Sequence, residues 1–361
     1  MDLTEIAIAK GPSTCKNKRI FRVTKKTVKA NVILLVAAVI CLLLFLFVGS
    51  RDHIGTDINT NENTYNVIHR GSLSLLYMEP AYIIASKILP AFQALVFAYA
   101  FISLGLKELT FVRLSKYFYV SLLLFYSDIM IRYDMGIMRQ GLAIAFVILG
   151  WNYVSDEKLG KEYWITYALA IFCHYSAAAS IIPILFRKRK ISSGVMIGTS
   201  AVAFVLSNTS IINRLLQFIF SLLPGTIFAK YQGHMLAIDT GISIGNIRRF
   251  ALLFFFCILF DKFKEDDSRI RFFINSFYIG TLIYYLFKPY TIISGRLSIY
   301  FCCTETILLP YFLSKFKKRS IRMLIMCFIA LYTFYYTNMN VHSFTESWMN
   351  EPYLPYKSVL W

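Results

Sequence analysis

Long apolar runs separated by short charged clusters dominate the chain. A membrane-crossing helix needs about 20 mostly apolar residues, so this pattern predicts an all-α, polytopic membrane protein. The first run, VILLVAAVICLLLFLFVG, covers 32–49. The single spans that we expect are 32–49, 81–106, 116–131, 140–154, 191–207, 250–262, 272–288, 297–314 and 321–337.

The stretch 163–186 has charged clusters on both sides and is short for two full spans. We interpret it as a hairpin of two short helices that turns near His174. The chain then has about 11 transmembrane segments in total.

Loop charge predicts the orientation. Basic residues are concentrated in the N-terminal tail 10–29, and cytoplasmic segments carry an excess of Lys and Arg. The N-terminus is therefore expected in the cytoplasm and the C-terminus outside. The other loops assigned to the cytoplasm are 107–116, 155–162, 187–190, 261–271 and 315–322.

The chain shows neither an internal repeat nor a linker rich in Ser, Gly or Pro. We expect a cytoplasmic basic tail at 1–31, one transmembrane domain at 32–337 and an outer tail at 338–361. Outer loops are placed at about 50–80 and 208–249. The latter begins near INRLLQFIFSLLPG, whose apolar spacing suits a helix lying in the outer interface.

Composition supports the membrane assignment. Apolar residues make up 57% of the chain and charged residues 16%, and the mean hydropathy is +0.57. The net charge of +18 comes largely from loops between apolar runs, which argues against a nucleic-acid-binding face. Six of the seven Cys lie in apolar runs and without metal-ligand context, so we expect packing residues and no metal site.

With this topology, charged residues collect at the outer face, where Arg is unusual. Charges within or beside apolar runs are costly and usually have a partner or a function. The outer set comprises Arg51, Asp52, His53, Asp57, Glu62, Glu79, Arg132, Asp134, Arg139, Arg248, Arg249, Lys288 and Arg296.

Each candidate also has a structural interpretation. Arg51 and Asp57 follow the first span and could offer a guanidinium and a carboxylate to a substrate, or form a solvated loop with a snorkelling Arg. Glu79 precedes Pro80 and could cap a helix.

Arg132 and Arg139 are two helical turns apart, and paired guanidiniums suit a diphosphate. The alternative is a structural ion pair with Asp128 or Asp134. His174 is a natural proton acceptor near neutral pH, or a hydrogen-bonded core residue.

These residues fall in a pattern that resembles the EpsG/Wzy-type bacterial polysaccharide polymerases, close to the O-antigen and exopolysaccharide repeat-unit polymerases. The closing E-P-Y-L-P-Y at 351–356 also resembles the family's tail. The matching motifs, in chain order, are R-x-x-x-G-x-D with a later Tyr (Arg51, Gly55, Asp57, Tyr65), E-P-x-Y (Glu79, Pro80, Tyr82), R-Q-x-L-A (Arg139, Gln140, Leu142, Ala143), H-x-S (His174, Ser176) and G-R-L-x-x-Y (Gly295, Arg296, Leu297, Tyr300).

The resemblance implies a polymerase in the bacterial inner membrane with its active site on the periplasmic face. Such proteins transfer a glycan from undecaprenyl diphosphate to another lipid-linked repeat unit, without a nucleotide sugar, a cofactor or a required metal. The implied partners are the undecaprenyl-diphosphate-linked oligosaccharide, the bilayer, a chain-length regulator (polysaccharide co-polymerase) and a flippase.

We assign Arg139 and Arg296 to the diphosphate, with Arg51 and Arg132 in support. His174 or Glu79 would accept the proton of the acceptor hydroxyl, and Asp57 would bind sugar hydroxyls or orient Arg51. The supporting polar residues are Tyr65, Tyr82, Gln140, Ser176 and Tyr300. The alternatives are an O-antigen ligase-like glycosyltransferase and a flippase or transporter of lipid-linked oligosaccharides.

Overall fold

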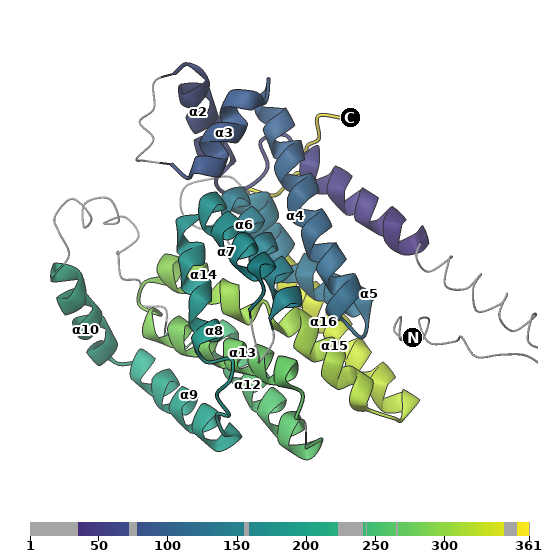
Figure 1. Ribbon diagram of the computed structural model, residues 1–361, viewed down its shortest axis with the longest axis vertical. Helices are drawn as coiled ribbons and strands as arrows, with labels where there is room; N and C mark the ends of the chain where they lie inside the picture. Colours follow the sequence, from purple (N-terminus) through teal and green to yellow (C-terminus); the bar gives the residue numbers. More distant parts are fainter. Residues whose placement is uncertain are drawn as a thin grey trace, which may run out of the picture. The chain divides into compact units, whose positions relative to one another are not determined.

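Figure 1 shows the computed structural model of the chain, which describes residues 35–71, 78–154, 159–222, 241–242, 244–264, 266–342 and 352–360. Within these ranges every regular element is a helix, apart from an isolated bridge between Arg51 and Ser358. The all-α class is therefore confirmed. The predicted tail 1–31 and residues 223–240 of the predicted outer loop lie outside the described residues.

The chain forms two compact units, each described here by itself. Unit 1 comprises Met1–Leu142 and Met326–Trp361, and unit 2 comprises Ala143–Ile325. Both boundaries fall inside continuous helices, α6 (Met138–Gly150) and α16 (Arg319–His342). The chain thus passes from one unit to the other without a linker, and its assignment as one domain stays a prediction.

The elements follow each other in the order shown in Figure 1. Unit 1 contains the helix Leu35–Gly49, α2 (Ile58–His69), α3 (Pro80–Ile88), α4 (Phe92–Leu114), α5 (Phe118–Leu124), the π-helix η2 (Phe125–Gly136), the start of α6 and most of α16. Unit 2 contains the rest of α6, the 3-10 helices η3 (Trp151–Tyr153) and η4 (Tyr175–Ile181), α7 (Lys161–Cys173), α8 (Ile182–Leu185), α9 (Ser193–Ser207), α10 (Ser210–Ser221), α12 (Ile244–Lys262), α13 (Ser268–Leu286), α14 (Thr291–Cys302), α15 (Glu305–Lys315) and the start of α16.

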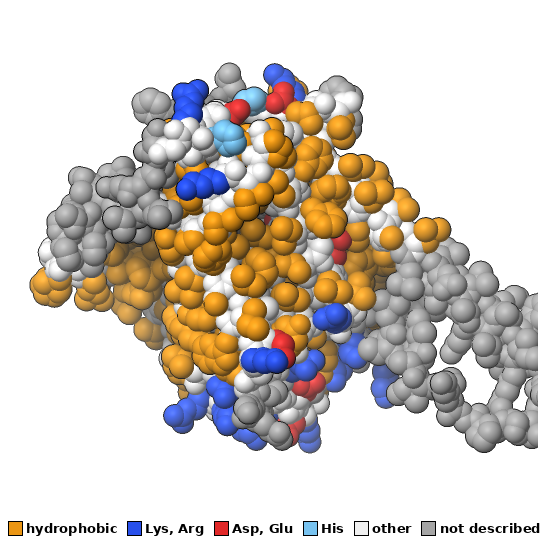
Figure 2. All heavy atoms as spheres, turned by 45° about the horizontal axis from the view of Figure 1, so that its top comes forward, with side chains coloured by type: hydrophobic (Ala, Val, Ile, Leu, Met, Phe, Trp, Pro, Cys, Tyr) orange, Lys and Arg blue, Asp and Glu red, His pale blue; other side chains and the backbone are white. Residues whose placement is uncertain are grey.

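Some helices have the length and composition to cross a membrane. Among the described residues, α4 and α16 qualify alone, and the bent pairs α9–α10 and α14–α15 bring the number to at most four. Figure 2 shows a face on which apolar side chains predominate. On α16, Phe328 and Phe334 are 69% and 77% exposed, which suits contact with lipid. The predicted 11 segments and the orientation of the termini stay predictions.

Two stretches that the sequence predicted as continuous helices are interrupted in the structure. The predicted span 81–106 is two helices, α3 and α4, because Pro90 follows Leu89, whose backbone is extended. Beyond α5 the chain forms the π-helix η2, which ends at Gly136, and the non-helical Ile137 separates it from α6. The continuous α-helix implied between Arg132 and Arg139 is therefore interrupted.

A buried polar cluster holds η2 and α6 against α4. Lys107 Nζ lies 2.7 Å from both carboxylate oxygens of Asp134, and Ser103 Oγ lies 2.5 Å from Asp134 Oδ1. The Lys107 side chain is fully buried. The assignment of Lys107 to a loop was wrong, because α4 continues to Leu114 and Asp134 compensates the buried charge. The side of the membrane on which this end of α4 lies stays a prediction.

In unit 2 the stretch 163–186 turns where the sequence predicted. Helix α7 ends at Cys173, His174 adopts an extended backbone, and η4 and α8 follow. The Tyr167 hydroxyl donates to the Ala178 carbonyl at 3.0 Å, which joins the two arms of the turn.

Helix α10 is bent by 82° from α9. The side chains of Ile211, Leu215 and Phe218 are 57%, 46% and 63% exposed, and their spacing places them on one face. The amphipathic helix expected in this part of the predicted outer loop is therefore present, and its position at the membrane interface stays a prediction.

Candidate active site

The first motif forms a tight elbow after the helix Leu35–Gly49. Gly55 has φ +126°, a conformation that residues with a Cβ rarely adopt, and a Cβ there would collide with the Met135 carbonyl. The elbow therefore packs directly against the end of η2, which is possible because residue 55 is glycine.

The Arg51 side chain points into unit 1 and is 1% exposed. Its guanidinium donates to the Val48 carbonyl at the end of the preceding helix and lies 3.8 Å from the Met138 sulfur. Burial lowers the pKa of Arg51 to about 10, so it remains a cation at neutral pH. Arg51 is thus neither a snorkelling surface residue nor openly exposed to a ligand, and its supporting role stays a prediction.

Asp57 occupies the N-cap position of α2 without a side-chain capping bond. His53 in the same elbow contacts two carboxylates, Asp52 Oδ1 at 2.6 Å and Glu62 Oε2 at 3.0 Å. The hydrogen bond with Asp52 raises the pKa of His53.

Two predicted supporting tyrosines join α2 to the α3 region. The Tyr65 hydroxyl donates to the Leu89 carbonyl at 2.8 Å, and the Tyr82 hydroxyl donates to the Asn61 carbonyl at 2.6 Å. Each such bond stabilises the fold by about 0.5–1.5 kcal/mol. These contacts make both residues structural supports of the elbow and of the segment that bears Glu79.

Glu79 and Arg139 form the central ion pair of unit 1. Arg139 Nη1 lies 2.5 Å from Glu79 Oε2, and the guanidinium lies over the Tyr82 ring at 5.6 Å from its centroid. Glu79 occupies the N-cap position of α3 and Pro80 follows it in the first turn, as the capping interpretation expected, but the Glu79 side chain makes no capping bond. The Glu79 and Arg139 side chains are 8% and 18% exposed, so part of the Arg139 side chain is accessible.

Arg132 forms an ion pair with Asp128, with Nη1 3.2 Å from Oδ1. This is the structural alternative that the sequence analysis gave for this arginine. Its side chain remains 29% exposed. The Gln140 side chain is fully buried. The break at Ile137 removes the reason to expect Arg132 and Arg139 on one face, because that expectation assumed a continuous α-helix.

Unit 2 brings three predicted residues into one hydrogen-bonded chain. His174 Nδ1 accepts a bond from the Ser176 backbone N–H at 3.3 Å and lies 2.8 Å from Ser176 Oγ. Ser176 Oγ lies 3.0 Å from the Tyr300 hydroxyl. Arg296 is four residues before Tyr300 in α14, so both occupy the same side of that helix.

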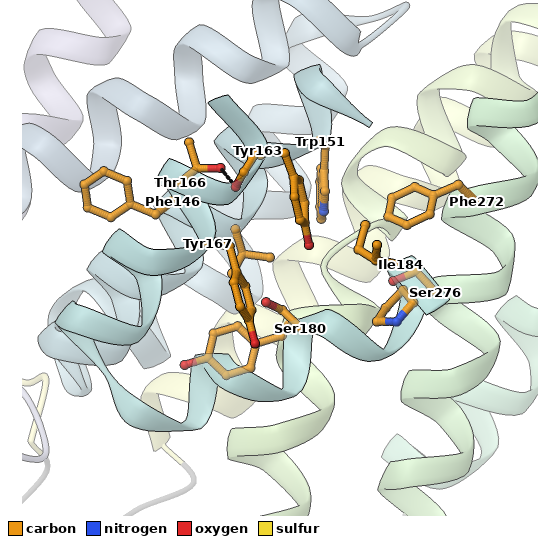
Figure 3. Close-up of a pocket in the computed structure, with 13 residues that line it drawn as sticks. Phe146, Trp151, Tyr163, Thr166, Tyr167, Ser180, Ile184, Phe272 and Ser276 are labelled. Atoms are coloured by element: carbon orange, nitrogen blue, oxygen red, sulfur yellow. Dashed lines mark hydrogen bonds between the residues drawn. The ribbon is translucent and has the colours of Figure 1, made fainter. Parts of the chain in front are cut away.

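A small hollow beside this chain shares Tyr300 in its lining. It holds about 330 Å³ of empty space, part of it open to solvent. Figure 3 shows Trp151, Tyr163, Tyr167 and Phe272 around it, with the Ser180 and Ser276 hydroxyls nearby. Neither His174 nor Arg296 lines this hollow.

Several polar groups were not recognised as site candidates from the sequence. Glu305 pairs with Arg248 inside unit 2. Glu305 could have been recognised from the sequence, because its carboxylate lies inside the predicted span 297–314, where a charge is costly and usually has a partner or a function. Tyr353, near Arg51, Asp57 and Arg132, had no signal beyond its place in the tail motif. No group of three or more His, Cys, Asp or Glu side chains in the described ranges could hold a metal ion.

Comparison with known proteins relates the chain to one family. The family model for the EpsG family matches residues 34–358. This range contains all five motifs of the sequence analysis, from Arg51 to Tyr300. No curated protein and no solved structure matches the chain.

Proposed function

The chain belongs to the EpsG family, and we propose that it polymerises a polysaccharide at the membrane. In this reaction a glycan leaves undecaprenyl diphosphate and is joined to a hydroxyl of a second lipid-linked repeat unit. The bond between the anomeric carbon and the phosphate oxygen breaks, and a glycosidic bond forms. The acceptor hydroxyl loses a proton, and undecaprenyl diphosphate departs with the bonding electrons.

The observation that carries the proposal is the Arg139–Glu79 pair. Arg139 contacts Glu79 through Nη1, and its side chain stays 18% exposed, so the guanidinium is oriented by the carboxylate and can still be approached by phosphate oxygens. A guanidinium already oriented by a carboxylate can stabilise the charge that develops on a leaving diphosphate without reorganising. Glu79 then orients Arg139, which makes it a poorer candidate for the base.

His174 is the better candidate for the base. Its Nδ1 accepts from the Ser176 N–H, so in this arrangement Nδ1 carries a lone pair. A proton taken from an acceptor hydroxyl near Ser176 or Tyr300 can pass through the Ser176 hydroxyl to Nδ1. Arg296, one turn from Tyr300, would bind phosphate in the same unit.

The outer leaflet of the inner membrane is the proposed place of the reaction, since the predicted topology assigns these residues to the outer face. A flippase that delivers the repeat units and a chain-length regulator are the proposed partners.

Complementation of a strain that lacks this gene tests the proposal. Arg139→Ala, Arg296→Ala and His174→Ala should each lower polymer formation by about a hundredfold or more, because each removes a group that acts in the transition state. Arg113→Ala, at an exposed end of α4, is the matched control and should leave the glycan ladder unchanged. Normal ladders from variants present at wild-type levels would disprove the site.

A polymerase and a ligase differ in the molecule that accepts the glycan, and the glycans of the deletion strain distinguish the two. If the protein is a polymerase, a strain that lacks its gene should retain the capped single repeat unit and lose the ladder. Loss of the single repeat unit as well would favour a ligase.

A further inference from the structure

The C-terminal segment 352–360 forms part of the candidate site of unit 1. The Asp52 N–H donates to the Lys357 carbonyl at 3.0 Å, the Gly55 N–H to the Pro352 carbonyl at 2.8 Å, and the Val359 N–H to the Ser50 carbonyl at 2.8 Å. The segment therefore runs antiparallel to the Arg51–Asp57 elbow along its length.

Side chains also anchor this segment to the end of the helix Leu35–Gly49. The Tyr356 ring stacks on Phe47 with centroids 4.5 Å apart, and its hydroxyl donates to the Phe47 carbonyl at 2.5 Å. The Ser358 hydroxyl lies 3.0 Å from the Ser50 hydroxyl. These contacts attach the segment to the end of the first helix.

Tyr353 has a different environment. It is 4% exposed, and its hydroxyl reaches the junction between Thr56 and Gly136. A Cβ on Gly136 would lie 2.8 Å from the Tyr353 hydroxyl and 3.0 Å from Thr56 Oγ1. The hydroxyl occupies this place because residue 136, the last of η2, has no side chain.

Three predicted site residues surround that hydroxyl. Arg132, Asp57 and Arg51 all lie close enough for their charges to act on Tyr353. Burial raises the pKa of Tyr353 to about 12, so the group is a neutral hydroxyl at physiological pH. The hydroxyl can therefore hydrogen-bond with Thr56 in the elbow while it lies against Gly136 at the end of η2.

We propose that Tyr353 is a positioning residue, which holds the Thr56–Asp57 turn against the end of η2 and thereby fixes Asp57 and Arg132 for the substrate. The proposal rests on the proposed function, because it assigns these two residues to the lipid-linked substrate. Residues 352–356 of the tail motif are then part of the site, because the segment 352–360 pairs with the first motif.

Kinetics with reconstituted protein test this role. The substrate is the lipid-linked repeat unit that accumulates in the deletion strain, and the readout is its initial rate of consumption. Tyr353→Phe should lower kcat by about tenfold or more with a smaller change in KM, since displaced catalytic groups cost rate. Tyr356→Phe makes the same chemical change in the same segment and should remain close to wild type.

Gly136→Ala supplies an independent perturbation of the same contact. Its methyl group displaces the Tyr353 hydroxyl, so kcat should fall to a similar extent. In the double variant Gly136→Ala/Tyr353→Phe the clash with the hydroxyl is absent. The decrease in kcat, expressed as a free energy, should therefore be smaller than the sum of the free-energy costs of the two single variants.

The outcomes separate this proposal from the proposed function. A Tyr353→Phe variant with wild-type kcat, an equal loss in Tyr356→Phe, or a loss that follows the amount of folded protein would each overturn the positioning role. If the wild-type protein consumes no repeat unit, the proposed function itself fails and the role of Tyr353 fails with it.

Discussion

At the scale of single residues, partners decide what each charged side chain can do. Arg139 is held by Glu79 at 2.5 Å and stays partly exposed, whereas Arg51 is buried against a backbone carbonyl. Both arginines lie in the family motifs, and the sequence could not distinguish them, because the burial of Arg51 depends on the pairing with the distant segment 352–360. The His174–Ser176 contact was easier to foresee, since the two residues are neighbours in one turn.

Arg139→Lys tests whether the guanidinium fork matters beyond its charge. Lysine keeps the cation and loses the planar donors that can contact Glu79 and a phosphate together. We expect kcat to fall by about tenfold, equivalent to about 1.4 kcal/mol, in the reconstituted assay. An unchanged kcat would mean that only the positive charge is used.

His53 predicts a pH dependence of stability. Its pKa is raised in the folded protein, first by the hydrogen bond with Asp52, so protonated His53 stabilises the fold. This contribution is complete below the unfolded pKa of about 6.5 and is lost as the pH rises through the higher folded value. The wild type should therefore exceed His53→Gln in thermal stability in detergent at pH 5, and the difference should fade at alkaline pH. A difference that grows with pH would contradict this account.

At the scale of elements, the junction between η2 and α6 carries both Arg132 and Arg139. The apolar pattern predicted helices on both sides of it, which the structure confirms. The π-helix and the break at Ile137 could not be predicted, because they depend on the approach of α4 and on Gly141. A Cβ on Gly141 would lie 2.7 Å from the Tyr133 carbonyl and 2.9 Å from Asp134 Oδ1.

Lys107→Met tests the importance of the buried cluster that supports this junction. Removing one partner of a buried ion pair leaves an uncompensated charge and costs about 3–5 kcal/mol, so unfolding in detergent should occur at a much lower temperature. The double variant Lys107→Met/Asp134→Leu removes both charges and should recover most of the loss. A double variant as unstable as the single one would show that the pair is needed for another reason.

At the scale of the whole molecule, two compact units each hold a set of polar residues from the family motifs. Unit 1 holds the Arg139–Glu79 pair and the elbow, and unit 2 holds the His174–Ser176–Tyr300 chain. Apolar runs were sufficient to predict an all-α membrane protein. They could not give the division into units, because both boundaries lie within uninterrupted helices.

The family relation also predicts what the reaction does not need. Purified protein in liposomes should retain its rate in the presence of a metal chelator and without added nucleotide sugar. The measurement is the initial rate of repeat-unit consumption. Inhibition by the chelator that added Mg²⁺ reverses would contradict a metal-independent reaction.

The most direct test of the central claim is polymer formation by the purified protein alone. Liposomes containing the wild type and the lipid-linked repeat units of the deletion strain should yield a ladder of longer lipid-linked glycans, with release of undecaprenyl diphosphate. Liposomes containing His174→Ala or Arg139→Ala should yield single repeat units. Folded wild-type protein that leaves all repeat units single would contradict the account.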